Sequence, residues 1–382
     1  MKYYIIAGEA SGDLHGANLI KELKRKDPNA DIRCWGGDKM QAAGGYVVKH
    51  IKYLAFMGFF EVLKHLGTIL NNISFCKQDI LAYQPDVVIL IDYPGFNFRL
   101  FKFLKQHHFP IFYYISPQLW AWKTSRVYKV KEYVDRMFVI FPFEKEFYER
   151  YGVKVDFVGH PLLDELQFTE DANGLTTPTF AAQQTPATNQ KIIAILPGSR
   201  KQEISYLLPE YLKVIDSFPD YKFVVTGMSN IGADFYQKII GNARCEIVYD
   251  QTYAVLEKST AALVTSGTAT LETALHNVPE VISYKGSWIS YYIAKALIKN
   301  IRFICIVNLI CDQRIVEELI QADVNKDRLI KELRKILSDE GRKEMLKGYD
   351  LLRSKLGNRG ASERAATLML GYLKPVTSSS SK

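Results

Sequence analysis

The chain has 382 residues, of which 48% are hydrophobic and 24% charged, and its formal net charge at pH 7 is +8. This composition excludes a largely disordered, collagen-like or coiled-coil chain, and the length suggests two domains rather than one. The longest apolar stretch without Lys, Arg, Asp or Glu, residues 109–122, is interrupted by Pro110 and Pro117 and is too short to cross a membrane.

The positive charge predicts an anionic partner, and charge alone leaves nucleic acid, anionic lipid and phosphorylated substrates open. The five cysteines include no C-x-x-C pair, so we expect reduced core residues and neither disulfides nor a zinc site. The histidines show no ligand spacing, and therefore no metal or cofactor is expected. The first apolar segment ends at Glu9, too short for a signal peptide, which favours a cytoplasmic location.

Short apolar runs alternate with helical patterns, as is typical of α/β proteins with parallel sheets. The first series predicts six strands, at residues 3–7, 32–35, 87–91, 111–115, 137–141 and 155–158. The second series predicts five strands, at residues 191–196, 223–226, 245–249, 261–264 and 281–284. Between the two series, residues 167–190 are rich in Thr, Ala, Gln and Pro without an apolar period, which predicts a linker or surface insertion.

The predicted fold class is α/β, with two Rossmann-like doubly wound parallel-sheet domains facing an interdomain cleft. We assign residues 1–166 to the N-terminal domain and residues 191–338 to the C-terminal domain. Residues 339–374 are predicted to be charged helices, and residues 375–382 a disordered tail. Open α/β sheets bind ligands beyond the carboxyl ends of their strands, so candidate site residues are sought there.

The first strand leads into a loop with three glycines four residues apart, Gly8, Gly12 and Gly16. A tight turn with nothing bound explains the glycines alone, but Glu9 and Asp13 on the rim favour binding of a sugar hydroxyl. The spacing is not G-x-G-x-x-G, which argues against a dinucleotide site.

Asp92 follows the continuous apolar run 87–91 and is the best single candidate for a general base, because burial raises a carboxyl pKa. A turn or helix-capping role before Pro94 explains it equally well from local sequence alone.

In the second domain, Ser199 and Arg200 follow the first strand, where a guanidinium can neutralise a diphosphate. The segment from Ser266 through Gly267 and Thr268 opens a helix whose N-terminus suits a phosphate, and Glu272 on its first turns is placed to take a ribose diol. A well-capped helix without a ligand is the structural alternative.

An apolar helix over residues 56–73 carries bulky residues beyond what one core-facing stripe needs. Trp120 and Trp122 stand next to a basic run. Most such segments are core or solvated surface, but together with the net charge they favour peripheral attachment to anionic lipid. The residues predicted to contact membrane or acyl chains are Phe56, Met57, Phe59, Phe60, Trp120 and Trp122.

Eight motifs occur in order along the chain: GEASGD at 8–13, MGxxEV at 57–62, IDxP at 91–94, SPxxWAW at 116–122, FPFE at 141–144, GHP at 159–161, LPGSR at 196–200 and SGTA at 266–269. In this order and spacing they resemble the lipid-A-disaccharide synthase family over essentially the whole chain. The resemblance implies a GT-B glycosyltransferase with an acceptor-binding, membrane-facing N-terminal domain, a UDP-sugar donor domain, and C-terminal helices that return to the first domain.

The implied reaction is inverting and needs no metal. It transfers 2,3-diacylglucosamine from its UDP derivative to the 6-hydroxyl of 2,3-diacylglucosamine 1-phosphate, forming a β-1,6 disaccharide and UDP. The implied partners are these two lipids and the cytoplasmic leaflet of the inner membrane, with a homodimer left open and no nucleic acid.

The resemblance also implies residue roles. Asp92 matches the catalytic carboxylate, Arg200 the arginine beside the UDP phosphates, and Ser11 the acceptor-side loop. The Asn…Glu-Leu-x-Gln segment that borders the donor site falls on Asn308, Glu318 and Gln321.

Three alternatives remain. One is another GT-B enzyme, such as a cell-wall hexosaminyltransferase or a UDP-sugar epimerase. The second is a nicotinamide dehydrogenase, and the third is a non-catalytic, membrane-peripheral nucleotide-binding protein.

Overall fold

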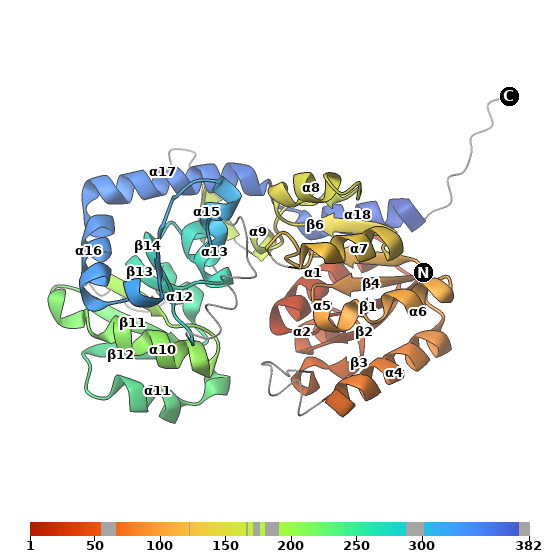
Figure 1. Cartoon of the computed structure of the whole chain (residues 1–382), viewed down its shortest axis with the longest axis horizontal. Coiled ribbons are helices and arrows are strands. Elements are labelled where there is room, and N and C mark those ends of the chain that lie inside the picture. The colour runs from red at the N-terminus through yellow and green to blue at the C-terminus, as the bar shows by residue number, and fades with distance from the viewer. Residues whose placement is uncertain are drawn as a thin grey trace. The chain divides into compact units, whose positions relative to one another are not determined.

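A computed structural model describes residues 1–54, 66–121, 123–165, 167–170, 176–179, 191–287 and 302–373. The chain divides into two compact units (Figure 1). The first comprises Met1–Asp164 together with the segment that begins at Asn358, and the second comprises Glu165–Gly357.

The first unit is built on a seven-stranded parallel sheet of order β3-β2-β1-β4-β5-β6-β7. The strands are β1 Lys2–Ile6, β2 Asp31–Gly36, β3 Tyr46–His50, β4 Val87–Ile91, β5 Ile111–Tyr114, β6 Arg136–Val139 and β7 Asp156–Phe157. The helices are α1 Ala10–Lys26, α2 Asp38–Ala42, α4 Leu66–Tyr83, α5 Pro94–Asn97, α6 Phe101–Gln106, α7 Val127–Tyr133, α8 Pro142–Glu149 and α18 Ala361–Leu373, with α9 Leu162–Glu165 at the boundary.

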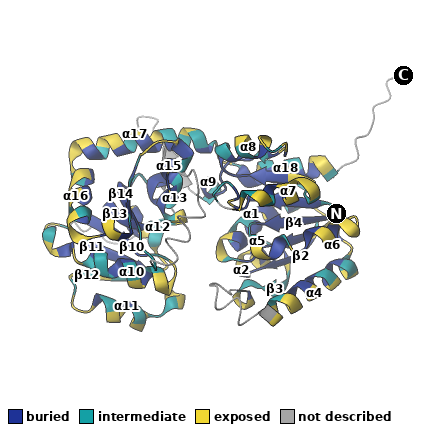
Figure 2. Cartoon of the chain, in the orientation of Figure 1, coloured by how far each residue is buried: buried dark blue, intermediate teal, exposed yellow. Residues whose placement is uncertain are grey.

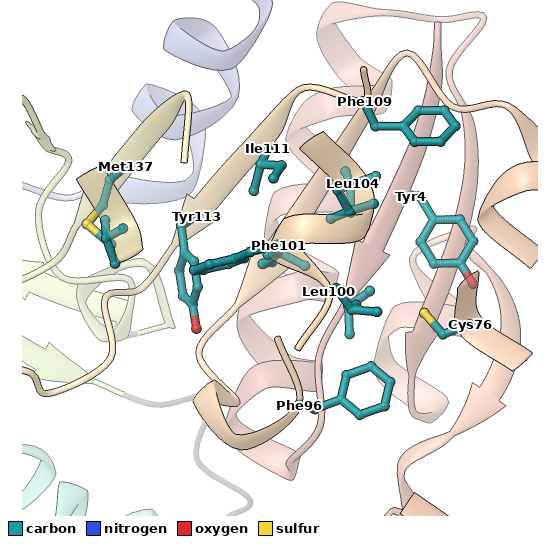
Figure 3. Packing of buried hydrophobic residues seen from close by; sticks show 14 of the residues in the cluster. Tyr4, Cys76, Phe96, Leu100, Phe101, Leu104, Phe109, Ile111, Tyr113 and Met137 are labelled. Atoms are coloured by element: carbon teal, nitrogen blue, oxygen red, sulfur yellow. The ribbon is translucent and has the colours of Figure 1, made fainter. Parts of the chain in front are cut away.

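Helices cover both faces of this sheet, so its central strands read as continuous apolar runs. One face packs against α4, α6 and α7 and forms the core shown in Figure 3, where Tyr4 and Tyr113 from the strands meet Phe101 and Leu104 from α6. The opposite face packs against α1 and α18, which lie side by side. Three polar groups in this core form a hydrogen-bonded chain: the Trp35 indole N–H donates to the Tyr4 hydroxyl, which donates to Asp79.

The second unit holds a six-stranded parallel sheet of order β12-β11-β10-β13-β14-β15. Its strands are β10 Ile192–Leu196, β11 Lys222–Gly227, β12 Cys245–Tyr249, β13 Ser259–Thr265, β14 Glu280–Tyr284 and β15 Glu317–Ile320. Its helices are α10 Lys201–Leu212, α11 Ala233–Ile240, α12 Thr252–Leu256, α13 Thr268–Leu275, α15 Ile306–Cys311, α16 Lys326–Leu337 and α17 Asp339–Leu356. In both units the strands are mostly buried and the helices expose one side (Figure 2).

The eleven predicted strands are all present, with ends shifted by up to two residues. The prediction missed two edge strands, β3 and β15. Both are only partly buried, and their mixture of polar and apolar residues lacks the continuous apolar character of the central strands.

The predicted linker 167–190 has local structure in its described part. Strands β8 Gln167–Glu170 and β9 Thr176–Thr179 pair antiparallel, with Phe168 opposite Pro178. The pattern there was too short and polar to predict a hairpin.

The assignment of residues 339–374 to the first domain was wrong for α17. The Tyr349 hydroxyl donates to the carbonyl of Val278, and Gly348 lies so close to Ile315 that a Cβ there would be 2.3 Å from that side chain. These contacts hold α17 in the second unit, and of the described helices only α18 returns to the first. The remaining predicted tail residues lie outside the described ranges.

Candidate active site

In the first unit, the loops after β1 and β4 lie at the same edge of the sheet, because the two strands pair in parallel with Ile6 opposite Leu90. Glu9 comes three residues after Ile6, and Asp92 comes two residues after Leu90. The two carboxylates are close enough for the charge of Glu9 to act on Asp92. The topology therefore joins two predicted site residues that are far apart in sequence.

Asp92 has the character of a general base. Burial, and after it the charge of Glu9, raises its pKa to about 6. A carboxylate with this pKa is ionised at neutral pH yet a better proton acceptor than an exposed one.

The backbone around Asp92 is strained. Asp92 and Tyr93 both have positive φ, 41° and 46°, a conformation that residues other than glycine rarely adopt. The Asp92 carbonyl accepts hydrogen bonds from the Asn97 side-chain amide at 2.7 Å and from the Tyr113 hydroxyl. Tyr93 packs over Gly8, where a Cβ would be 2.3 Å from its ring. Gly8 is thus needed for this close approach.

The three acceptor-side candidates, Glu9, Ser11 and Asp13, lie in different environments. Glu9 is half-buried at the N-cap of α1 with no capping hydrogen bond from its side chain, and Ser11 is exposed on the first turn. Asp13 is only 5% exposed, and its carboxylate accepts hydrogen bonds from the backbone N–H groups of Gly37, Lys39 and Met40. These bonds engage the Asp13 carboxylate at the start of α2, and its role on the acceptor side stays a prediction.

In the second unit, β10, β13 and β14 are adjacent, so the loops after them form neighbouring parts of one sheet edge. Arg200 stands in the first of these loops and is exposed. Its guanidinium donates to Glu203 at 3.2 Å, and the other oxygen of Glu203 accepts from the N–H groups of Ser199 and Arg200. Sequence reasoning missed Glu203, although an acid three residues after a helix N-cap is a capping signal.

The second loop carries Ser266, Gly267 and Thr268 at the start of α13. Gly267 and Thr268 are exposed, and no atom of the described part of the chain lies within 4 Å of where a Cβ of Gly267 would stand. The first backbone N–H groups of an α-helix have no intrahelical acceptor and attract anions. This arrangement can hold a phosphate.

Glu272 lies one turn further along α13. Burial raises its pKa, and the Tyr253 hydroxyl is hydrogen-bonded to its carboxylate. The Tyr253 ring packs against His276, 5.2 Å between centroids, and His276 in turn contacts the backbone carbonyl of Glu272. Tyr253 was not singled out from the sequence because α12 gives no motif.

Asn308 and Glu318 do not have free side chains. Asn308 is fully buried, its amide donates to Val316 and Glu318, and its carbonyl oxygen accepts from the N–H groups of residues 315 and 316. Glu318 also accepts from the N–H groups of Ile304 and Cys305, the start of α15. All four hydrogen-bonding positions of Asn308 are thus used within the protein, and its direct contact with the donor stays a prediction.

Gln321 differs from these two residues. It is 3% exposed, and its Oε1 accepts from the N–H of Gly286. Within the ranges that the structure describes, its Nε2 has no partner. Gln321 thus offers a buried donor at the carboxyl end of β15.

The membrane candidates are largely outside the described residues: Phe56, Met57, Phe59, Phe60 and Trp122. Trp120 is half-buried, with its ring edge-on to Phe143 at 5.0 Å. Nearby Glu144 accepts hydrogen bonds from the N–H groups of Ile140 and Phe141, and burial raises its pKa to about 8. The contact of Trp120 with membrane or acyl chains stays a prediction. No helix in the described ranges is long and apolar enough to cross a membrane.

Comparison with solved structures identifies the class. UDP-GlcNAc 2-epimerase from Neisseria meningitidis, solved bound to UDP-GlcNAc, matches with a TM-score of 0.66 at 13% identity, over 97% of this chain and 100% of that one. The calicheamicin glycosyltransferase CalG4 matches with a TM-score of 0.62 at 16% identity, over 98% of each chain. The fold, with two parallel-sheet α/β units, is GT-B.

The particular family follows from sequence comparison. The family model described as lipid-A-disaccharide synthetase matches residues 3–370. The lipid-A-disaccharide synthase of Geobacter sulfurreducens is 38% identical over 381 residues, covering 97% of this chain and 96% of that protein. The chain belongs to the lipid-A-disaccharide synthase family and is a glycosyltransferase.

Proposed function

We propose that the protein transfers 2,3-diacylglucosamine from UDP-2,3-diacylglucosamine to the 6-hydroxyl of 2,3-diacylglucosamine 1-phosphate, with inversion, forming a β-1,6 disaccharide and releasing UDP. The observation that carries the residue assignment is Asp92, a half-buried carboxylate beyond a central strand whose pKa is raised to about 6. Family membership supports the reaction.

In the proposed mechanism, the Asp92 carboxylate takes the proton of the acceptor 6-hydroxyl while that oxygen attacks the anomeric carbon of the donor. The bond between the anomeric carbon and the phosphate oxygen breaks, and its electron pair leaves with UDP. Attack from the side opposite the leaving group inverts the configuration. Glu9 assists because its negative charge makes Asp92 a stronger base.

The donor is assigned to the second unit. Arg200 and the N-terminus of α13, at Ser266, Gly267 and Thr268, are proposed to hold the diphosphate, whose negative charge increases as the bond breaks. Ser199 is proposed to shape the loop next to Arg200. Glu272 is proposed to accept hydrogen bonds from the ribose hydroxyls. On the acceptor side, Glu9 and Ser11 are proposed to contact the sugar.

Peripheral association with the cytoplasmic leaflet of the inner membrane is part of the proposal. The elements on either side of residues 55–65 expose four large hydrophobic side chains. These are Tyr46 on β3, Tyr53 in the turn after it, and Leu70 and Phe75 on α4. Lys49 and Lys52 lie over the Tyr53 ring at 5.8 and 5.0 Å. Aromatic residues next to lysines suit the surface of an anionic bilayer. The protein should co-sediment with vesicles that contain phosphatidylglycerol. The sedimented fraction should fall when the vesicles are pure phosphatidylcholine or when the salt concentration is high.

The test of the reaction is UDP release with both lipid substrates in detergent micelles containing EDTA, for the wild type, Asp92→Ala and Asp38→Ala. Asp38 is an exposed carboxylate of the same unit and serves as the control. The proposal expects release that needs both substrates, persists in EDTA, falls at least about 100-fold in Asp92→Ala and is unchanged in Asp38→Ala. Absence of release from folded wild-type protein would reject the reaction, and full activity of Asp92→Ala would reject the base.

A further inference from the structure

The third loop at the carboxyl edge of the second sheet contains a cation that the sequence analysis did not identify. Lys285 directly follows β14, and Ser266 donates its backbone N–H to the carbonyl of Ser283, two residues before Lys285. The ladder between β13 and β14 therefore places Lys285 next to the loop that opens α13. Arg200 reaches the other side of β13, from the loop after β10.

Lys285 is held in place. Its side chain is 26% exposed, and its ammonium donates to Glu210 on α10 at 2.8 Å. The other carboxylate oxygen of Glu210 pairs with Lys213 at 2.7 Å, so the three charges leave a net charge of +1. Of the three donors of the Lys285 ammonium, this contact uses one within the described residues.

The residue after Lys285 adds a second donor. The Gly286 N–H donates to Oε1 of Gln321, which fixes the orientation of the amide and leaves Nε2 as the free end. A buried amide donor without a partner is costly unless a ligand satisfies it. Among the residues that the structure describes, none has an atom within 4 Å of where a Cβ of Gly286 would stand.

We propose that Lys285 binds the diphosphate of the donor from the side opposite Arg200, next to Gln321, whose place at the donor site the family motif already implies and whose Nε2 is available to the same ligand. This inference rests on the proposed function, since it refines the site assigned there to UDP. Arg200 and Lys285 stand in the two loops that flank the loop opening α13, and two cations there would neutralise a diphosphate that the helix dipole alone compensates only in part. Glu210 orients Lys285 without cancelling the positive charge of the group.

The test is binding of UDP and of uridine, by calorimetry and ligand-observed NMR, to the wild type, Lys285→Met, Lys285→Arg and Lys222→Met. Lys222→Met is the matched control because it removes a lysine that pairs with Glu246 at the amino end of β11, the sheet edge opposite the candidate site. We expect Lys285→Met to weaken UDP binding about tenfold or more, with Lys285→Arg retaining most of it. Uridine binding, which involves no phosphate, should change less than about twofold in every variant.

The possible results distinguish a failure of the Lys285 assignment from a failure of the proposed UDP site. A wild type that does not bind UDP overturns the donor site and this inference together. UDP binding that is unchanged in Lys285→Met overturns the role of Lys285 alone. Equal loss of UDP and uridine binding in Lys285→Met and Lys285→Arg also overturns it, because Lys285 would then support the fold rather than the phosphates.

Discussion

The Tyr113 hydroxyl donates a hydrogen bond of 2.5 Å to the backbone carbonyl of Asp92. Tyr113 lies on β5, one strand over from β4, and it is fully buried. With Asn97, which donates to the same carbonyl, it stabilises a turn in which two consecutive non-glycine residues have positive φ. The orientation of the candidate base therefore depends on a neighbouring strand.

Tyr113→Phe is expected to lower kcat about tenfold while KM stays within about twofold, because the lost hydrogen bond positions Asp92 and does not bind substrate. Steady-state kinetics with both lipid substrates would measure this. The control is Tyr3→Phe, which removes a hydroxyl that donates to Asp27 at 3.0 Å near the opposite end of the sheet. Equal kcat values in wild type and Tyr113→Phe would contradict the positioning role.

The pH dependence of activity should report Asp92. Below a pH of about 6 the base becomes protonated, so kcat/KM should fall tenfold per pH unit. Glu9→Gln should move the midpoint to lower pH, because the negative charge of Glu9 is the second cause of the raised pKa. A pH–rate profile with the same midpoint in wild type and Glu9→Gln would show that the two carboxylates are not coupled.

Asp92→Asn should increase stability while abolishing activity. The folded-state pKa of Asp92 lies above its ordinary value of 3.8, so the native protein binds more protons than the unfolded chain between pH 4 and about 6. The free energy of unfolding therefore decreases as pH rises through this window. At pH 8 the variant should be more stable by roughly 1–3 kcal/mol, and at pH 4 the gain should be much smaller. Urea denaturation at both pH values measures the difference, and a gain that is independent of pH would contradict the explanation.

Asp164 should be essential for the docking of α18. Its carboxylate accepts hydrogen bonds from the backbone N–H groups of Gly360, Ala361 and Ser362, the N-terminus of that helix. Asp164→Ala should cost about 1–3 kcal/mol, because it removes a cap and leaves these donors without an acceptor. Hydrogen exchange across α18 should show the loss locally.

The matched control for this helix is Glu363→Ala, which removes an exposed carboxylate that pairs with Arg25 and Lys26. Exposed ion pairs contribute little, so we expect a cost below about 1 kcal/mol. Similar protection of α18 in the wild type and Asp164→Ala would refute the capping role.

Much of the fold follows from local sequence patterns. The central strands are buried on both faces and leave continuous apolar runs, such as residues 87–91, that can be read without a structure. Edge strands β3 and β15 are not marked in this way, since most of their residues are only partly buried. The position of α17 was also unpredictable, because a helical pattern predicts a buried face but does not say which unit that face packs against.

Residue types at strand ends likewise identified Asp92, Arg200 and the segment 266–268 as candidates, since parallel sheets bring the carboxyl ends of their strands to one edge. What each side chain does there depends on its partners. Glu9 and Asp13 stand four residues apart at the start of α1, yet the Asp13 carboxylate caps α2 while the charge of Glu9 acts on Asp92.

The sequence by itself determined the family, the two-domain α/β class and the order of the candidate motifs, because these depend on residue type and spacing along one dimension. Only the tertiary structure decided that Asn308 and Glu318 are satisfied within the protein, that Tyr113 supports Asp92, and that Lys285 stands next to the α13 loop. Hydrogen-bond saturation and burial depend on residues brought together from distant parts of the chain, and no local pattern records those contacts.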